Sequence, residues 1–297
     1  MKILAIIVSY NFTHWMARCL GSLRASHCQA DVMVLDNASA DDTVTRIRQE
    51  FPEVTLIENG QNLGFGRANN IGMVYALDHG YEGVLLLNQD AWIDADTLGA
   101  LAAASSKHPD FGILSPIHLT GSRQRVEQGF ADYTGLRSMD CLPKEAVVEA
   151  DFIDAAIWYM PATALRKVGL FAPLFYHYGE DKDMVNRMHY HGLRIGWMPQ
   201  YCGCHDREFR QQTRARFLHA ERVYHLSEYA NIRYSFPKAF AMGVLAVGKK
   251  MLKALGKGSW KDFTAYASIA GWLLGKTFVV WHTRRTSIHV HLQNYRS

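Results

Sequence analysis

Short apolar runs alternate with segments of helical spacing over the first 105 residues, and this alternation restricts the possible folds more than any other feature. The run at 3–8 is continuous and β-branched, as is typical of a strand covered on both faces. Further strands are predicted at 32–35, 54–58 and 84–87, with helices at about 13–23, 41–49, 67–77 and 95–105. This order predicts an α/β fold, in which a parallel sheet carries helices on both faces.

The remaining pattern is less regular. Residues 112–148 are rich in turn residues and predict a strand followed by a loop or hairpin region over the cleft. Beyond them we expect a strand at 152–160, a short helix between Pro161 and Gly169, a helix at about 180–191 and a strand at 193–197. With 48% hydrophobic residues, the 297-residue chain can bury a sizeable core, which excludes disordered and collagen-like proteins.

Polar clusters follow three of the predicted strands, at Ser9–Asn11, Asp36–Ser39 and Asn88–Asp90. Ligands of such sheets lie beyond the carboxyl ends of the strands, so the three clusters are expected to converge on one polar site. Burying the carboxylates of Asp36 and Asp90 is costly unless something binds them. The oxygens of 88–90 are ligands of the type that Mg²⁺ or Mn²⁺ prefers. The alternative for each Asp is that it caps the following helix.

A glycine-containing loop, Asn62–Gly66, leads into the helix at 67–77 and is followed by Asn69 and Asn70. Its backbone N–H groups and amide side chains could contact a phosphate or a ribose. The loop lacks both the G-x-G-x-x-G pattern and the Lys of a P-loop, so a plain turn is the alternative.

The densest acidic cluster is Tyr178–Asp183. On the helix that follows, Asp181 shares one face with Met184, Val185 and Met188, so we predict that it points inward. Its place at a helix start favours the ionised form, which makes it the candidate general base. Asp183 lies four residues before Arg187 and could pair with it at the surface; helix capping is the alternative for the cluster.

His205 follows Cys202-Gly203-Cys204. A structural zinc site needs four ligands, and the sequence offers no second cluster, so we expect His205 to add one ligand to a metal held by Asp90. A basic stretch then follows, and it suits a diphosphate, although a solvated helix face is the alternative; its members are Arg207, Arg210, Arg214 and Arg216.

Taken in order, these segments resemble the family 2 inverting glycosyltransferases, especially the bacterial branch that contains rhamnosyltransferases. The resemblance is carried by Ile7–Asn11, Val34–Ser39, Asn62–Gly66, Leu87–Asp90, Val168–Phe171, Tyr178–Asp183, His205 and Tyr229–Arg233. It covers residues 1–235, and the shared order is more specific than any single segment.

The resemblance implies a GT-A fold, with a Rossmann-like mixed sheet. Residues 1–118 would bind the nucleotide sugar, 119–236 the acceptor, and 237–297 would form a helical tail. The donor-binding residues that it implies are Ser9, Tyr10, Asn11, Asp36, Asn62, Gly64, Asn69, Asn88, Gln89 and Arg210. Asp90 and His205 would hold Mg²⁺ or Mn²⁺, although Asn88 replaces the first Asp of the family's D-x-D.

The implied activity is metal-dependent, inverting hexosyl transfer from dTDP-rhamnose or a UDP-sugar to a hydroxyl of a glycan or lipid-linked acceptor, in bacterial surface polysaccharide synthesis. Asp181 would be the base, with Glu180 and Asp183 orienting it or binding the acceptor. A noncatalytic carbohydrate- or nucleotide-sugar-binding protein is the alternative, but it gives no reason for three aspartates to converge. A pyrophosphorylase would need a glycine-rich N-terminal loop with a basic residue, which Ser9–Asn11 is not.

The charge of the chain is divided unevenly at Pro237. From there on, ten Lys or Arg residues and one acid give +9, whereas the first 236 residues carry 22 bases and 27 acids, giving −5. The apolar stretch 263–281 has Lys276 as its one charge and lies near the lower length limit for a membrane span, and 239–255 is amphipathic. We expect an interfacial helix pair on an anionic membrane surface; ordinary helices that pack on the domain are the alternative.

The sequence also bears on location. Five cysteines without a C-x-x-C pair favour a reducing cytosol. The run at 3–8 has no small-residue cleavage site after it, so it is expected to be a strand and not a signal peptide. We therefore expect a cytoplasmic protein, peripheral on the inner face of the cell membrane, with no nucleic-acid partner.

Overall fold

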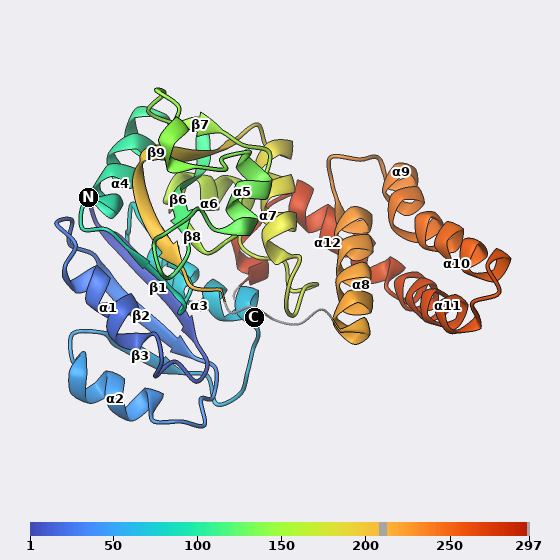
Figure 1. The fold of residues 1–297 in the computed structure, drawn as a ribbon, viewed down its shortest axis with the longest axis horizontal. Helices are drawn as coiled ribbons and strands as arrows, with labels where there is room; N and C mark the ends of the chain where they lie inside the picture. Colours follow the sequence, from blue (N-terminus) through green and yellow to red (C-terminus); the bar gives the residue numbers. More distant parts are fainter. Residues whose placement is uncertain (208–212, 296–297) are drawn as a thin grey trace.

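The structure is a computed structural model that describes residues 1–207 and 213–295. Figure 1 shows two parts: a body built around a twisted sheet, and a helical extension beside it. Within the described residues the sheet has nine strands in the order β3-β2-β1-β4-β8-β6-β9-β5, with β7 paired to β9. The mixed α/β fold predicted from the sequence is thereby confirmed.

Strands β1 (Ile3–Ser9), β2 (Asp31–Asp36), β3 (Thr55–Glu58) and β4 (Gly83–Leu87) form the parallel half that the sequence predicts. β8 (Ile157–Pro161) runs antiparallel to β4, and β6 (Phe111–Leu119) antiparallel to β8. β9 (Arg194–His205) is parallel to β6. The carboxyl ends of β1, β2, β4, β6 and β9 and the amino end of β8 therefore share one edge of the sheet, which we call the active edge.

Helices cover both faces of the sheet. Apolar residues of α1 (Met16–Arg24), α2 (Thr43–Glu50) and α4 (Thr97–Lys107) pack with Ile3, Ile7 and Leu85 on one face. On the other, α3 (Phe65–Asp78), α6 (Ala162–Val168) and α7 (Glu180–Tyr190) pack against Leu4, Ile6 and Leu86. Helix α6 follows Pro161 and ends at Gly169, as predicted.

Two local expectations differ from the structure. The helix expected at about 13–23 begins only at Met16, and the hydroxyl of Thr13 donates to Asp41, on the segment before α2. The region after β6 contains a helix, α5 (Gln128–Thr134), because Glu127 accepts a hydrogen bond from the N–H of Phe130 and starts it. After α5 come a 3₁₀ turn (Met139–Cys141) and the short strand β7 (Val148–Glu149).

Strand β9 is longer than the predicted 193–197. After a register shift its last residues pair with β6 again and with β5 (Ala91–Ile93), a short strand that the sequence pattern did not reveal. Ala91 is the register partner of His205, so this pairing brings the end of β9 next to Asp90.

The C-terminal residues form the extension together with α8 (Arg214–Ala230). They comprise α9 (Phe236–Phe240), a π-helical turn (Ala241–Leu245), α10 (Ala246–Gly256), α11 (Trp260–Gly275), α12 (Thr277–Ile288) and a 3₁₀ turn (Leu292–Tyr295). Leu226, Tyr229, Val247 and Leu273 are among the residues of its own apolar core.

The residues after Pro237 stay in contact with the rest of the chain through α12 and the residues that follow it. The guanidinium of Arg284 donates to the carbonyls of Asn231 and Tyr234, and a ring nitrogen of His191 lies 2.9 Å from the carbonyl oxygen of Ser287. Tyr295 is buried in the core of the body. Residues 237–295 are thus anchored at both ends.

Within the described part of the chain, no single helix has the length and apolar character to cross a membrane. Helices α11 and α12 meet these criteria together, but the pair is bent by 55°. The apolar stretch 263–281 is therefore broken at Lys276, the residue between the two helices.

Candidate active site

Side-chain amides join the polar ends of β1, β2 and β4. Gln89 bonds the backbone of Tyr10 twice, accepting from its N–H at 2.8 Å and donating to its carbonyl at 3.2 Å. The N–H of Asn11 donates to Ser39 Oγ, and Asn11 Oδ1 accepts from the N–H of Ala40, both at 2.9 Å. Three segments that are far apart in the sequence therefore form one polar surface, while the ring of Tyr10 stays exposed.

Asp36 is buried, and its carboxylate is occupied within the protein. It accepts hydrogen bonds from Ser9 Oγ at 2.9 Å and from the N–H and hydroxyl of Ser39. Ser9 is likewise fully buried. In this arrangement Asp36 and Ser9 hold the turn after β2, and they present little surface to a nucleotide base.

The Asn62–Gly66 loop begins α3 and contacts a second loop. Asn62 Oδ1 accepts from the N–H of Gly64, and the Tyr176 hydroxyl donates to the Asn62 carbonyl. Gly64 has a φ of 78°, and a Cβ there would lie 2.0 Å from the Tyr176 carbonyl oxygen. Only glycine fits this crossing.

Asn69, a predicted donor contact, is buried. It is 1% exposed, and its amide donates to the Phe65 carbonyl one turn earlier in α3. Asn70 is also buried and joins α3 to the segment after α6, through two hydrogen bonds with the backbone of Phe171. Both amides therefore stabilise the packing of α3.

Asn88, Asp90 and His205 lie together at the active edge. Nε2 of His205 is 3.6 Å from Oδ1 of Asp90, and the Asp90 carbonyl accepts from the N–H of Asp206. The buried Oδ1 of Asn88 has no hydrogen-bond partner. A partly exposed carboxylate and, two residues earlier, an unpartnered amide oxygen are donors of the kind that suits a divalent cation such as Mg²⁺ or Mn²⁺.

Two further residues converge on His205, and neither was singled out from the sequence. His118, on β6, and Asp154, just before β8, are buried with it. Donor atoms of the three lie within 4.8 Å of one another, a group that could hold a metal ion. His118 is a polar residue near the end of a strand. The same pattern singled out Asp36 and Asp90 in the sequence, so it could also have singled out His118. Asp154 gave no such signal, because the antiparallel direction of β8 is not visible in the sequence.

The acidic start of α7 faces the same region. Burial, together with the charge of Asp181, raises the pKa of Glu180 to about 7. Burial raises the pKa of Asp181 to about 6, and the charge of Asp154 adds to the effect. Asp181 is partly buried and Glu180 almost fully buried, with its Oε2 unpartnered.

Asp183 does not lie where an acceptor could reach it. Its carboxylate accepts from Nε of Arg187 at 2.8 Å, and both side chains are buried, not at the surface as expected. Arg187 also donates to the Val168 carbonyl. The pair joins α7 to α6.

The basic stretch divides among different partners. Arg207 approaches Asp154 at 3.9 Å, whereas Arg214 pairs with Asp262 of the extension at 2.7 Å. Arg210, the predicted diphosphate contact, lies outside the described residues.

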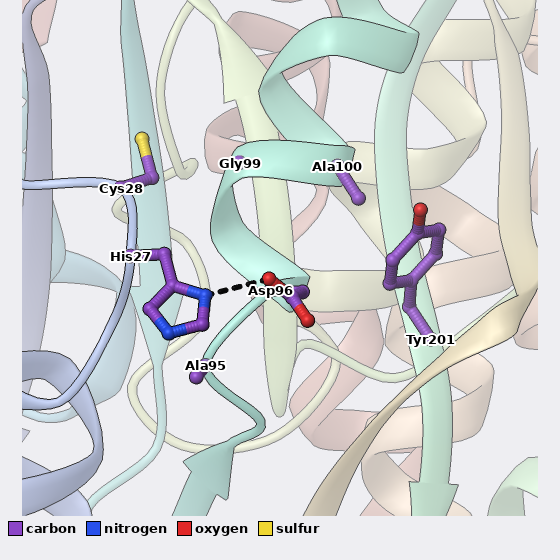
Figure 2. A pocket seen from close by; sticks show the side chains of 7 residues that line it. All are labelled: His27, Cys28, Ala95, Asp96, Gly99, Ala100 and Tyr201. Carbon is purple, nitrogen blue, oxygen red and sulfur yellow. Dashed lines mark hydrogen bonds and ion pairs between the residues drawn. The ribbon is translucent and has the colours of Figure 1, made fainter.

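A shallow pocket of about 370 Å³ opens elsewhere, between the start of α4 and β9 (Figure 2). It is lined by His27, Cys28, Ala95, Asp96, Gly99, Ala100 and Tyr201. His27 and Asp96 pair across it at 2.7 Å. None of the predicted site residues lines this pocket.

The fold is that of the GT-A glycosyltransferases. Residues 4–136 match "Glycosyl transferase family 2", and the comparisons together support a family 2 glycosyltransferase. Both the predicted fold type and the predicted family are thereby confirmed.

Relatives with assigned activities support this classification. An N-acetylglucosaminyl-diphospho-decaprenol L-rhamnosyltransferase of Mycobacterium tuberculosis is 26% identical over 226 residues, which are 66% of this chain and 72% of the relative. A low-salt glycan biosynthesis hexosyltransferase, Agl10 of Haloferax volcanii, is 24% identical over 204 residues, covering 66% and 64%. S. aureus TarS in complex with UDP-GlcNAc shares the fold with a TM-score of 0.61 and 15% identity, covering all of this chain and 90% of that one.

Proposed function

We propose that this protein moves a sugar from a nucleoside diphosphate to a hydroxyl of a glycan or lipid-linked acceptor, with inversion at the anomeric carbon. The observation that carries the proposal is the half-buried Asp181, whose pKa of about 6 leaves it ionised at neutral pH. A sugar hydroxyl is a poor nucleophile until a positioned carboxylate takes its proton.

In the proposed reaction Asp181 accepts the proton of the acceptor hydroxyl while that oxygen bonds to the anomeric carbon. The bond from this carbon to the donor phosphate breaks, and its electron pair leaves with the nucleoside diphosphate. Attack opposite the leaving group inverts the configuration. The buried Glu180 precedes Asp181 and has the higher pKa, about 7, so a single proton shared by the two would reside on Glu180 and leave Asp181 ionised.

We propose Asp90 as the protein carboxylate that holds a divalent ion with the donor diphosphate. The unpartnered Oδ1 of Asn88 supports this, because an orphaned buried oxygen fits a missing ligand. When bound, Mg²⁺ or Mn²⁺ would stabilise the charge on the leaving diphosphate. Gln89 and Tyr10 would line the adjoining nucleotide surface.

We propose dTDP-rhamnose or a UDP-sugar as the donor and a lipid-linked glycan as the acceptor. The mycobacterial relative is named as a rhamnosyltransferase of a diphospho-decaprenol acceptor, and TarS was solved with UDP-GlcNAc. Both are in keeping with a role in bacterial surface polysaccharide synthesis.

A nucleotide thermal-shift series with and without Mn²⁺ tests this function. A nucleotide at about 100 times its Kd stabilises a protein by about 2.7 kcal/mol, so UDP or dTDP is expected to raise the Tm by several degrees when Mn²⁺ is present. The sugar donors are then assayed for hydrolysis and transfer. No shift with any nucleotide would instead favour a noncatalytic carbohydrate-binding protein.

We propose further that the extension lies on an anionic membrane surface on the cytoplasmic side. Leu245 and Leu252 are exposed seven residues apart, on one face of the helical segment that contains α10, with Lys249 between them. Trp260 and Phe278 are 67% and 75% exposed. Apolar side chains beside lysines are typical of interfacial helices, and the +9 charge of this part suits anionic lipid.

Substitution is the right test of membrane binding, since truncation at Pro237 would remove Tyr295 from the body core. The full chain is expected to sediment with phosphatidylglycerol vesicles, and less so at high salt. Leu252→Glu combined with Trp260→Glu should weaken binding about tenfold or more, because each substitution removes an exposed apolar side chain that would be buried in the lipid. Leu142→Glu, an exposed leucine of the body, is the control. Equal vesicle binding by all three proteins would contradict membrane docking.

A further inference from the structure

We propose that the rings of Tyr133 and Phe152 form an aromatic platform on which a pyranose ring of the acceptor stacks beside Asp181. Tyr133 lies on α5, and Phe152 lies on the segment between β7 and β8. Neither residue was singled out from the sequence. This role rests on the proposed sugar transfer and adds to it the surface that holds the acceptor and the part of a sugar that this surface recognises.

The two rings hold each other in place. Their centroids are 4.7 Å apart and their planes meet at 87°, which is the edge-to-face arrangement that aromatic pairs prefer. The side chain of Tyr133 is 42% exposed, and Phe152 is partly buried. A tyrosine fixed in this way offers a rigid surface to a ligand, and little conformational entropy is lost when the ligand binds.

Helix α5 lies against the active edge, and this places Tyr133 there. Phe130, one turn before Tyr133, is fully buried, and its ring centroid is 4.8 Å from that of His118 on β6. At the start of the helix, a Cβ on Gly129 would lie 3.6 Å from Nη1 of Arg207, the arginine that follows β9. Helix α5 is therefore packed on the β6 and β9 side of the edge, whereas the proposed donor surface lies at the ends of β1, β2 and β4.

The segment around Phe152 is attached to the helix that carries the proposed base. Nζ of Lys182 lies 5.1 Å from the centre of the Phe152 ring. The N–H of the same lysine donates to Oδ1 of Asp181 at 2.7 Å. Further along α7, Nε2 of His189 lies 3.1 Å from the carbonyl oxygen of Asp151. Two contacts with α7 therefore fix the platform relative to Asp181.

The hydroxyl of Tyr133 lies near enough to the carboxylates of the site for their charges to act on it. The protein around this hydroxyl excludes water and raises the pKa of Tyr133 to about 12, and the charges of Asp154 and Asp181 add to the effect. The hydroxyl is therefore protonated at neutral pH and can donate a hydrogen bond. A tyrosine joins an apolar ring to a polar tip, which suits a sugar, whose C–H groups lie on the ring faces and whose hydroxyls lie around the rim.

The position of the platform selects the acceptor as its ligand. The acceptor hydroxyl must reach Asp181 to lose its proton, so the sugar ring that carries this hydroxyl lies next to the base. Stacking buries roughly 50–60 Å² of the apolar face of a sugar, and at about 25 cal/mol per Å² this corresponds to about a tenfold change in affinity.

The test is the binding of methyl glycosides to the full chain in the presence of UDP and Mn²⁺. The probes are the methyl glycosides of glucose, N-acetylglucosamine, galactose, mannose and rhamnose, whose methyl group is too small to bind the apolar surface of the extension. Saturation-transfer NMR reports which sugar protons contact the protein, and a titration gives the Kd. At least one glycoside is expected to bind, with the C–H protons of one ring face most strongly saturated.

Tyr133→Ala should raise the Kd of that glycoside about tenfold, whereas Tyr133→Phe keeps the ring and should lose less affinity. Tyr224→Ala is the matched control and should bind like the wild type. Tyr224 is 53% exposed on α8 and packs edge-to-face on His225, with ring centroids 5.1 Å apart. In transfer assays with the same glycoside, Tyr133→Ala should raise the acceptor KM about tenfold, while kcat and the Kd of UDP stay within about twofold, since stacking is equal in the ground state and the transition state.

The platform is overturned if none of the glycosides binds the wild type, if Tyr133→Ala binds them as the wild type does, or if Tyr133→Ala weakens the binding of UDP instead. If Tyr133→Ala does not fold, Phe152→Leu removes the other ring and decides by the same comparison. Glycoside binding that depends on Tyr133, without any sugar transfer by the wild type, would support the platform as a glycan site and contradict the proposed transferase activity. The failure of one is thus distinguishable from the failure of the other.

Discussion

Replacing Asp181 with Asn is expected to remove almost all sugar transfer while donor binding stays intact. Asn keeps the shape of the side chain but cannot take a proton from the acceptor hydroxyl. General base catalysis contributes about 10²–10⁴-fold, so kcat should fall by that factor. Donor affinity, measured by calorimetry with Mn²⁺, should stay within about twofold, because the proposed donor surface lies at the ends of β1, β2 and β4.

The proposed role of Asp181 also predicts the direction in which kcat changes with pH. Burial, followed by the charge of Asp154, raises the pKa of Asp181 to about 6, so the ionised base is lost as the pH falls through 6. Wild-type kcat should therefore rise with pH through this value and then level off. The small residual rate of Asp181→Asn should lack this step.

Glu180→Gln is the matched control, because it changes the adjoining residue of the same helix start. Glu180 is almost fully buried and has a pKa of about 7, so it is half protonated at neutral pH. The substitution should lower kcat less than Asp181→Asn. The opposite order, with Asp181→Asn near the wild-type rate, would move the base to Glu180.

Much of the fold of residues 1–118 could be predicted from the sequence. The buried runs at β1, β2 and β4 and the polar residues after them obey local rules, since each parallel strand ends at the same edge. Helix α7 was predicted in the same way, from the helical spacing of its apolar residues. Its Met184, Val185 and Met188 are buried as expected.

What the sequence did not reveal depends on strand direction and on distant packing. The antiparallel run of β8 places Asp154 at the active edge, and the pairing of β9 with β5 brings His205 to Asp90. Arg187 pairs with Asp183 in the interior because its guanidinium also reaches the Val168 carbonyl of α6. No short-range pattern contains this information. The same holds for Tyr295, which returns to the core of the body.

Replacing Asp90 with Asn is expected to abolish the part of donor binding that needs a divalent ion. Asp90 is a quarter exposed at the active edge, and an amide oxygen in its place lacks the charge that attracts the cation. Loss of an outer-sphere partner alone costs about 10- to 100-fold in metal affinity, and loss of the ligand should cost more. UDP and dTDP titrations, each run with Mn²⁺ and with a chelator, measure the difference.

Asp96→Asn is the control for this substitution. Asp96 lies six residues further along the chain, is exposed, and pairs with His27 at the pocket beside α4 (Figure 2). Its substitution removes the same charge from the molecule and should leave the Mn²⁺-dependent binding unchanged. An Asp90→Asn protein that still binds nucleotide more tightly with Mn²⁺, to the wild-type extent, would show that Asp90 does not hold the donor's ion. Asn88 stands where the D-x-D pattern has its first carboxylate, so Asp90 is the acid left in this motif. Its substitution should therefore remove the whole carboxylate contribution of the motif to metal binding.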